Sequence, residues 1–218
     1  MSATTDHALL MDRIYRWQRR FGLYDATRKY YLLGRDPMLA GLKPPPGGTV
    51  LEIGCGTGRN LVKAAALYPE SRFHGIDISS EMLAAAQNAV ARGGLEDRIR
   101  LARADAAAFD AQKTFGTDSY DRIFISYAVS MIPPWQKVMA EAAARLAPGG
   151  ELHIADFGDM RGLPGWFGKG VRTWLDWHHV TPRADLFELA ADIAAAHGGR
   201  SEDRRLHRGF SWIAIVRR

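Results

Sequence analysis

Cysteine is nearly absent from this chain, because Cys55 is the only one in 218 residues. One cysteine cannot form an internal disulfide, and it argues against a thiolate metal cluster. No other spacing of His, Cys and carboxylates is typical of a metal site, so we expect no bound metal. The chain also lacks a signal-like apolar core near its start and any run close to the ~20 apolar residues of a membrane span. These absences predict a cytoplasmic protein.

The net charge of +5 is unevenly distributed along the chain. Lys and Arg outnumber Asp and Glu by 8 to 4 in residues 1–45 and by 10 to 7 in residues 157–218, whereas residues 46–156 have 11 against 13. Basic flanks around a nearly neutral centre suit an anionic membrane surface, nucleic acid or simple solubility. Charge alone leaves these three interpretations open.

Strand and helix patterns alternate from about residue 48 onward. Apolar runs at residues 49–53, 72–77, 98–104, 120–127 and 151–157 predict buried strands. Helical patterns separate them, including an Ala-rich helix that begins after Ser79, a residue type that caps helices well. Repeated βα units of this kind predict an α/β fold with a parallel, doubly wound sheet.

The two ends of the chain depart from this alternation. Residues 204–207 and 210–216 are strand patterns around Gly209 with no helix between them, which predicts an antiparallel hairpin at one sheet edge. Residues 1–45 show amphipathic helical patterns that end at Pro44-Pro45-Pro46. We therefore expect a Rossmann-like, seven-stranded domain in residues 46–218 and an N-terminal helical lid in residues 1–45.

A glycine-rich turn follows the first predicted strand, in the order Glu52-Ile-Gly54-Cys55-Gly56-Thr-Gly58-Arg59. Glycine lets the backbone turn tightly and approach a ligand closely, and the helix that follows presents free amides. The pyrophosphate fingerprint of NAD enzymes needs a small residue where this chain has Arg59, so the spacing favours the acidic-x-G-x-G-x-G form. Such turns also serve only to pack a helix on a strand, and the residues that follow decide between the two interpretations.

Acidic residues end the next two predicted strands. Asp77 stands nineteen residues after Gly58, close to the ~20 residues at which such folds place an acid on ribose hydroxyls. Asp105 ends the third strand, where a carboxylate can accept the adenine amino group. Because parallel strands finish at one edge of the sheet, the three acids Glu52, Asp77 and Asp105 are expected in one site.

These motifs resemble the series found in class I S-adenosylmethionine methyltransferases, in order over residues 48–157. The matching segments are Glu52 to Gly58, Gly75-Ile-Asp77-Ile-Ser79 with Met82-Leu83, Ala104-Asp105-Ala106, and Leu146-x-Pro148-Gly149-Gly150. The resemblance implies that Gly54 and Gly56 contact the amino-acid part of the cofactor and that Asp77 binds its ribose. It places Ile78 and Met82 against the adenine, with Asp105 and Ala106 on the adenine edge.

A narrower resemblance covers nearly the whole chain. Residues 24–36, 126–133, 156–158, 163–167 and 179–186 look like the bacterial diacylglyceryl-homoserine N-methyltransferases of betaine-lipid synthesis, which methylate a lipid-borne amine three times. The resemblance implies that Tyr24 and Arg35 close over the cofactor, Arg35 through the bidentate fork that suits a carboxylate. The full set of expected S-adenosylmethionine-binding residues is Tyr24, Arg35, Glu52, Gly54, Cys55, Gly56, Asp77, Ile78, Met82, Asp105, Ala106, Ser126 and Tyr127.

Methyl transfer from a sulfonium to an amine is a direct displacement, so the protein must chiefly align the amine with the methyl-sulfur axis. The candidate catalytic residues are Tyr127, which would orient the amine, with Tyr31 and His153. Weaker acid-base candidates are Asp156, His178 and His179. A trimethylated product is a cation that aromatic faces attract, and Tyr30, Tyr31, Tyr127, Trp135 and Trp166 are candidates for such faces. Each of these side chains also has an ordinary packing interpretation.

Residues 164–179 combine aromatic and basic side chains at helical spacing. Phe167, Val171, Trp174, Leu175 and His178 fall near one face, and Lys169, Arg172, Thr173 and Asp176 lie largely on the other. This pattern suits a helix at a membrane surface, and it equally suits a helix that covers the sheet or a pocket. We therefore treat contact with the inner, anionic face of a membrane as a hypothesis.

The narrower resemblance implies that the partner is an amino lipid rather than nucleic acid. Ile132-Pro133-Pro134-Trp135 superficially looks like the Pro-Pro-aromatic motif of adenine and glutamine methyltransferases, but Ile stands where that motif needs Asn or Asp. Alternatives that stay open are phosphatidylethanolamine, a quinone or a soluble metabolite as acceptor, and a cofactor-binding protein without catalysis. Fold alone does not separate these, because sites rather than scaffolds determine function.

Overall fold

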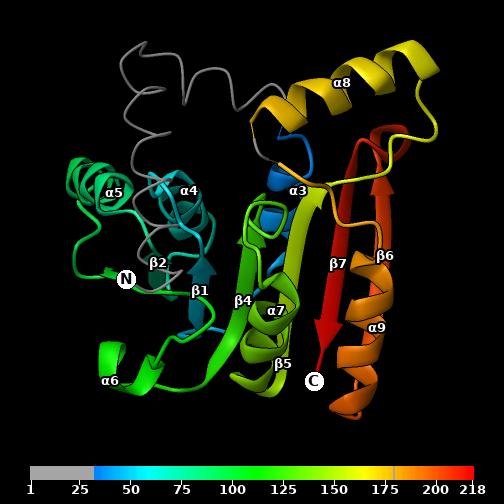
Figure 1. The fold of residues 1–218 in the computed structure, drawn as a ribbon. Coiled ribbons are helices and arrows are strands. Elements are labelled where there is room, and N and C mark those ends of the chain that lie inside the picture. The colour runs from blue at the N-terminus through cyan, green and yellow to red at the C-terminus, as the bar shows by residue number, and fades with distance from the viewer. Residues whose placement is uncertain (1–31, 179) are drawn as a thin grey trace.

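A seven-stranded sheet forms the centre of the protein, seen in a computed structural model that describes residues 32–178 and 180–218 (Figure 1). The strands are β1 (Thr49–Ile53), β2 (Arg72–Asp77), β3 (Ile99–Arg103), β4 (Tyr120–Ser126), β5 (Leu146–Phe157), β6 (Arg200–Leu206) and β7 (Ser211–Arg217). Their order is β3-β2-β1-β4-β5-β7-β6, with the first five parallel and β7 antiparallel to both of its neighbours. The predicted Rossmann-like sheet with an antiparallel C-terminal hairpin is confirmed.

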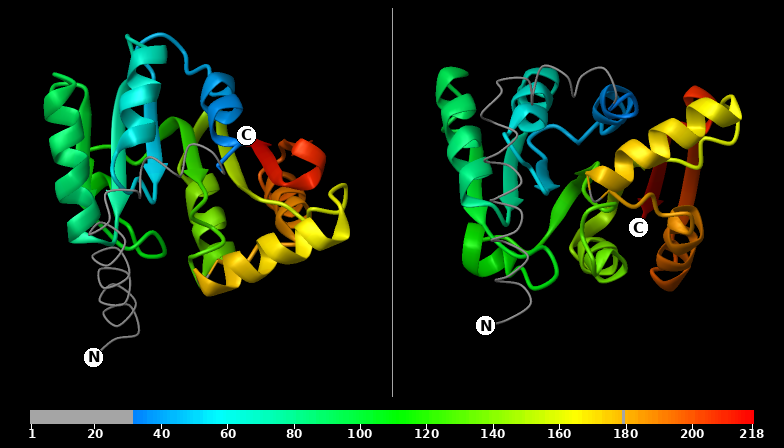
Figure 2. Two further views of the ribbon diagram at one scale, coloured as in Figure 1. Left: turned by 90° about the horizontal axis from the view of Figure 1, so that it is seen from above. Right: turned by 45° about the horizontal axis from the view of Figure 1, so that its top comes forward.

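Helices cover both faces of this sheet, and one lies at its end. The described helices are α3 (Arg35–Gly41), α4 (Arg59–Leu67), α5 (Ser80–Arg92), α6 (Ala111–Phe115), α7 (Trp135–Ala144), α8 (Gly165–Trp177) and α9 (Leu186–Ala196). Side chains of α3, α4 and α5 belong to the apolar cluster on one face, and those of α6, α7 and α9 to the cluster on the other. Figures 1 and 2 show α8 at the end of the sheet where β5 finishes.

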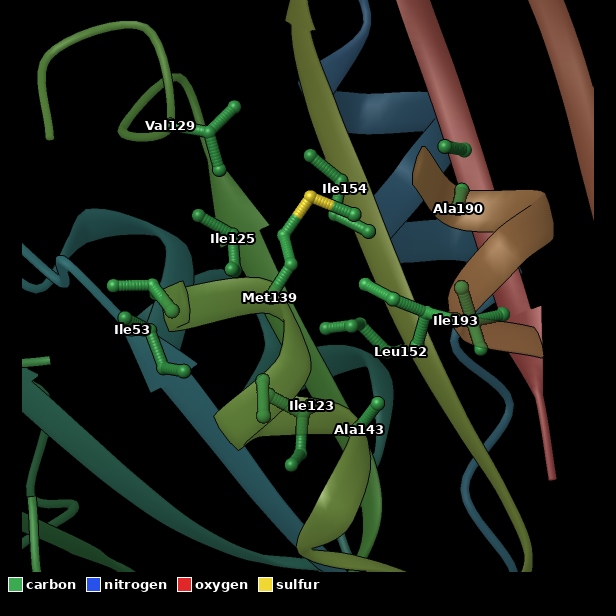
Figure 3. Packing of buried hydrophobic residues seen from close by; sticks show 14 of the residues in the cluster. Ile53, Ile123, Ile125, Val129, Met139, Ala143, Leu152, Ile154, Ala190 and Ile193 are labelled. Carbon is green, nitrogen blue, oxygen red and sulfur yellow. The ribbon is translucent and has the colours of Figure 1, made fainter. Parts of the chain in front are cut away.

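Alternation along the strands builds the two layers of core. Leu152 and Ile154 of β5 point to the face that carries α7 and α9, where they meet Met139 and Ile193 (Figure 3). Ala155 and Phe157 point to the opposite face, which carries α3 and α4. Because successive side chains of a strand point to opposite faces, a sheet covered on both sides reads as a continuous apolar run.

Local sequence explains where the site-bearing elements begin. The Ser79 hydroxyl accepts a hydrogen bond from the Met82 N–H at 3.2 Å. Ser79 therefore caps α5, as predicted. The hairpin is longer than expected, since β6 begins at Arg200 rather than at residue 204. This strand lies at the edge of the sheet and is largely charged, so it lacks the apolar run that marks the central strands.

The described part of the expected lid packs against the strands. Met38, Leu39 and Leu42 are at most 1% exposed and belong to the same cluster as residues of β1, β4 and β5. Tyr24, Tyr30 and Tyr31 lie outside the described residues, as does His179. The division into a lid and a main domain, and any closure over a ligand, stay predictions.

Candidate cofactor and acceptor site

The sheet reverses its strand order between β1 and β4. The chain leaves β1 toward one face and β4 toward the other. Open α/β sheets bind ligands in the crevice outside the carboxyl ends of the strands at such a switch point. The half-exposed residues of the expected site lie along this edge, at the ends of four neighbouring strands. They are Gly54, Gly56, Asp77, Ile78, Asp105, Ala106 and Ser126. The edge therefore assembles most of the predicted cofactor residues.

The glycine-rich turn needs glycine for two separate reasons. Gly54 and Gly56 have φ values of +74° and +53°, in the left-handed region that side chains disfavour. A Cβ on Gly54 would come within 2.9 Å of the Ala128 Cβ, whereas a Cβ on Gly56 would meet nothing within 4 Å. Gly54 thus lets the loop after β4 approach closely, and Gly56 faces open space that a ligand can use.

Asp77 connects the first two strand ends. Its carboxylate accepts the Gly56 N–H at 2.8 Å through one oxygen and the Ser79 N–H at 2.9 Å through the other. These bonds fix the carboxylate beside the glycine-rich turn, as a ribose-binding acid requires. Asp105 likewise accepts the N–H of Ala107 at 2.9 Å, which fixes the turn after β3.

Glu52 is a buried carboxyl group beneath the turn. The side-chain amide of Asn60 donates to its Oε1 at 2.7 Å, while among the described residues its buried Oε2 has no hydrogen-bond partner. Burial raises the pKa of Glu52 well above its usual range; the Asn60 bond opposes this shift, and the charge of Asp77 adds to it. A cofactor bearing a positively charged amino group fits this unsatisfied acceptor.

Arg35 and Cys55 flank this acid in different ways. Arg35 begins α3, is only 5% exposed, and its positive charge lowers the pKa of Glu52. The Cys55 side chain is buried in the core, where burial raises the pKa of its thiol, so only its backbone is available to a ligand. Met82 is also 1% exposed, with its side chain packed below the edge rather than displayed on it.

Tyr127, the first residue after β4, is held on three sides. Its N–H donates to the Ala155 carbonyl at 2.7 Å, its hydroxyl accepts the Gly34 N–H at 3.1 Å, and the same hydroxyl lies 2.9 Å from the Ser211 Oγ. Its φ of +53° is uncommon for a bulky residue and persists only where neighbours enforce it. Burial raises the pKa of Tyr127 to about 12, so it stays a phenol and does not act as a base at neutral pH.

His153 is a buried residue of β5 and does not lie on the open edge. It is 1% exposed, four residues before the end of β5, and its Nε2 lies 2.8 Å from the Glu151 Oε2. Glu151 also binds Arg217, so His153 belongs to an ion-pair group on the sheet. Burial lowers its pKa, which leaves the ring neutral and enclosed. This placement does not support direct contact with an acceptor, and the catalytic role stays a prediction.

The weaker acid-base and aromatic candidates lie on the α7 and α8 side. Asp156, at the end of β5, is fully buried, and burial raises its pKa to about 6. Trp135 is buried with the Arg183 guanidinium 5.6 Å above its ring, so it is a core residue. His178 ends α8, with its Nδ1 2.8 Å from the Trp174 carbonyl. No sequence pattern connects Asp156 with Ser130 and Arg183, which the fold brings together.

The surface of α8 confirms part of the predicted amphipathic pattern. Leu175 is buried and Val171 and Trp174 pack against the core, as expected for one face. Trp166 and Trp177, eleven residues apart, are 78% and 76% exposed, and three helical turns place them on the same side. Within residues 32–178 and 180–218, no helix combines the length and apolar character needed to cross a bilayer.

Comparison with known proteins identifies the fold and the enzyme class. Residues 50–150 match the methyltransferase domain family. The chain is 32% identical over 147 residues to a phosphatidylethanolamine N-methyltransferase of Cereibacter sphaeroides, an alignment that covers 67% of this chain and 68% of that protein. The chain belongs to the class I S-adenosylmethionine-dependent methyltransferases. Its cofactor is S-adenosylmethionine, and S-adenosylhomocysteine is the usual product.

Two further relatives agree with this assignment. The methyltransferase GfsG of Streptomyces halstedii is 36% identical over 110 residues, half of this chain and 38% of its own length. The apo structure of the S-adenosylmethionine-dependent methyltransferase SibL superposes with a TM-score of 0.70 at 18% identity, over 90% of this chain and 57% of that one. The chain thus spans about two thirds of the first relative and less of the others, and the structural likeness supports the fold alone.

The burial of Glu52 leads us to expect that the stability difference between Glu52→Gln and the wild type depends on pH in the cofactor-free protein. Because the pKa of Glu52 is raised on folding, its contribution to the free energy of unfolding is fully present below the unfolded pKa and is lost as pH rises through the folded pKa. Glu52→Gln keeps an acceptor for Asn60 without the titration. The variant should therefore gain stability relative to the wild type between pH 5 and pH 8, measured by urea unfolding.

The matched control is Glu70→Gln, which changes an exposed glutamate. Its stability difference from the wild type should stay nearly constant over the same pH range. A Glu52→Gln difference that is equally flat would contradict the burial of an ionisable acid beneath the turn.

Proposed function

We propose that this methyltransferase transfers methyl groups to the amine of an amino lipid, with diacylglyceryl-homoserine as the substrate and a betaine lipid as the product of three transfers. The observation that carries the proposal is the exposed aromatic surface of α8 at the carboxyl end of the sheet, the same end that holds the cofactor residues. The 32% identity to a phosphatidylethanolamine N-methyltransferase supports an amino-lipid acceptor.

On the cofactor side, the residues present fit S-adenosylmethionine. The bound cofactor supplies a methyl group on a positively charged sulfur. We assign Asp77 to the ribose hydroxyls, Asp105 with Ala106 to the adenine edge and Ile78 to the adenine face. Glu52, whose Oε2 is buried without a partner among the described residues, would receive the cofactor's ammonium, and Arg35 its carboxylate. The half-exposed Ser126 lies at the end of β4, and its buried Oγ has no partner among the described residues, so it is available to the cofactor.

On the acceptor side, the protein must present a neutral amine in line with the carbon-sulfur bond that breaks. The amine loses its proton before it attacks, and burial beside a positive charge lowers its pKa enough for water or a weak acceptor to take that proton. A strong general base is therefore unnecessary. We propose that Tyr127 orients the amine through the shape of the loop that it anchors, because its hydroxyl already contacts Gly34 and Ser211.

Contact with the membrane would follow from the α8 surface, defined here as exposed Trp166, Phe167 and Trp177 with the basic residues Arg161, Lys169, Arg172 and Arg208. The lead into α8 is tied to the turn between β6 and β7, because the Gly162 N–H donates to the Arg208 carbonyl at 3.1 Å. Aromatic rings insert at the level of lipid headgroups, and each exposed cation is attracted to anionic lipid. The N-terminal basic segment, residues 1–31, lies outside the described residues.

The role proposed for Asp77 at the ribose can be tested by substitution. Asp77→Ala should weaken S-adenosylmethionine binding at least about tenfold, because the ribose hydroxyls lose a charged acceptor that contributes ~1.5 to 3 kcal/mol. Asp121→Ala is the control, since Asp121 accepts the Thr49 N–H at 2.8 Å near the opposite end of the strands. Calorimetry should show normal affinity for the control, and normal affinity for a folded Asp77→Ala would refute the ribose assignment.

The acceptor itself is tested with methyl-labelled cofactor and four acceptors in mixed micelles. We expect mono-, di- and trimethylated diacylglyceryl-homoserine by mass measurement. The other three acceptors should react more slowly. Phosphatidylethanolamine has a different headgroup, demethylmenaquinone offers a carbon as the acceptor, and ethanolamine has no acyl chains. Preferential methylation of ethanolamine or of the quinone would overturn the amino-lipid proposal while leaving the methyltransferase class intact.

The membrane hypothesis predicts salt-sensitive binding to vesicles. Vesicles that contain anionic phosphatidylglycerol should retain the protein at low ionic strength and release it as salt rises, since exposed charges are screened over ~8 Å at physiological ionic strength. Replacing Trp166, Phe167 and Trp177 with serine should weaken retention without changing cofactor affinity. Leu67→Ser is the control, because Leu67 is exposed on α4. No association at any salt concentration would contradict a membrane-facing α8.

A further inference from the structure

The loop after β4, residues 127–134, is held by segments that are distant in the sequence. We call it the β4–α7 loop. The Ser130 N–H donates to the Asp156 Oδ2 at 3.1 Å, and the Ser130 carbonyl accepts the Thr181 N–H at 3.0 Å. One residue of the loop is thereby fixed on one side by the end of β5 and on the other by the segment between α8 and α9.

Arg183 holds the same loop on both sides of Ser130. Its Nε donates to the Val129 carbonyl at 3.0 Å and its Nη2 to the Ile132 carbonyl at 3.1 Å. The guanidinium also lies over the ring of Trp135, the first residue of α7. Only a planar fork donates to two carbonyls while it stacks on a ring, so lysine cannot replace arginine here without losing contacts.

The buried carboxylate of Asp156 and the positive charge of Arg183 stabilise each other. The two oxygens of Asp156 accept the N–H groups of Phe157 and Ser130, at 2.7 Å and 3.1 Å. Burial raises the pKa of Asp156 to about 6, while these bonds and the positive charge of Arg183 oppose the rise. At neutral pH the carboxylate is therefore charged and keeps both of its N–H partners, and the opposite charge of Arg183 stabilises it.

The loop so held borders the cofactor turn. Ala128 lies so close to Gly54 that a Cβ on Gly54 would approach its Cβ to 2.9 Å, and Met131 and Ile132 continue the loop toward α7. A shift of this loop would alter the side of the site that faces the glycine-rich turn. The loop also contains the Ser130 Oγ, a buried polar atom that has no partner among the described residues.

We infer that Arg183 is a positioning residue for methyl transfer, which fixes the β4–α7 loop so that the acceptor is aligned with the cofactor. The inference rests on the proposed methylation of an amine, and it connects that reaction to the segment that follows α8. Since the Arg183 contacts lie on the acceptor side, their loss should slow turnover while the cofactor still binds. A misplacement of about 1 Å is enough to reduce a rate on the order of a hundredfold.

Arg98 provides a matched control at the other end of the sheet. Its guanidinium donates to the carbonyls of Ala65, Tyr68 and Ser71 and lies 5.9 Å from the centre of the Phe73 ring. Arg98 precedes β3, so its contacts are of the same kind but lie at the amino-terminal edge, away from the crevice. Arg98→Lys therefore measures what such contacts contribute to stability alone.

The experiment compares Arg183→Lys with Arg98→Lys by thermal unfolding, S-adenosylmethionine calorimetry, steady-state kinetics and hydrogen exchange. The kinetic acceptor is the amine that the wild type methylates fastest among diacylglyceryl-homoserine, phosphatidylethanolamine and ethanolamine. Both variants should lose thermal stability and keep cofactor affinity within about twofold. Arg183→Lys alone should lower kcat by about tenfold or more and speed amide exchange at residues 129–132. If Arg183→Lys does not fold, Asp156→Asn is tested in its place, because it alters the carboxylate that accepts the Ser130 N–H.

Three outcomes would overturn the inference: an unchanged kcat in Arg183→Lys, an equal loss of kcat in Arg98→Lys, or unchanged exchange at residues 129–132. A loss of cofactor affinity that accounts for the whole rate change would do so as well. Failure of amine methylation, on which the inference rests, is distinguishable, because the wild type would then methylate none of these three amines. The exchange measurement would still decide whether Arg183 holds the loop.

Discussion

The pairing of β1 with β4 is the constraint from which the site follows. These neighbours in the sheet are separated in the sequence by two complete βα units, and residues 50–53 of β1 pair in parallel with residues 122–125 of β4. Because the chain departs from them toward opposite faces, nothing in the sheet itself closes the gap at their carboxyl ends. The glycine-rich turn and the β4–α7 loop form its two walls, and the contact of Gly54 with Ala128 sets how close they come.

The two walls are stabilised by different chemistry. On the cofactor side, single carboxylates accept backbone N–H groups, as Asp77 does from Gly56 and Ser79, and such bonds hold a turn in place while leaving acceptor capacity for a ligand. On the other wall, the Asp156 carboxylate accepts the Ser130 N–H, and the Arg183 guanidinium donates to the carbonyls of Val129 and Ile132. Buried polar groups demand such partners, so both walls are rigid without regular secondary structure.

The elements that carry the proposed cofactor residues could be predicted from the sequence, because those residues follow strands and are close together in the chain. Apolar runs located β1 and β2, and the glycine and acid spacing predicted Gly54, Gly56 and Asp77 as cofactor residues, which the fold brings to one edge of the sheet. Burial could not be predicted this way: Cys55 and Met82 match the motif, yet their side chains pack in the core. For the acceptor half, Arg183 is more than fifty residues away from the carbonyls it binds, and no local pattern records such a contact. His153 illustrates the same limit, because its strand position was predictable but its nearly complete burial and its contact with Glu151 were not.

The residues that follow α8 connect it to the β4–α7 loop by backbone and side-chain hydrogen bonds. The Val180 N–H donates to the Leu175 carbonyl at the end of α8, the Thr181 N–H reaches Ser130, and Arg183 binds the loop before α9 begins. A force on α8, such as insertion of Trp166 and Trp177 among lipid headgroups, would therefore be transmitted through only a few residues to the wall of the crevice. Where the acceptor is a lipid, the same contacts that hold the helix to the membrane would also set the position at which its amine meets the methyl group.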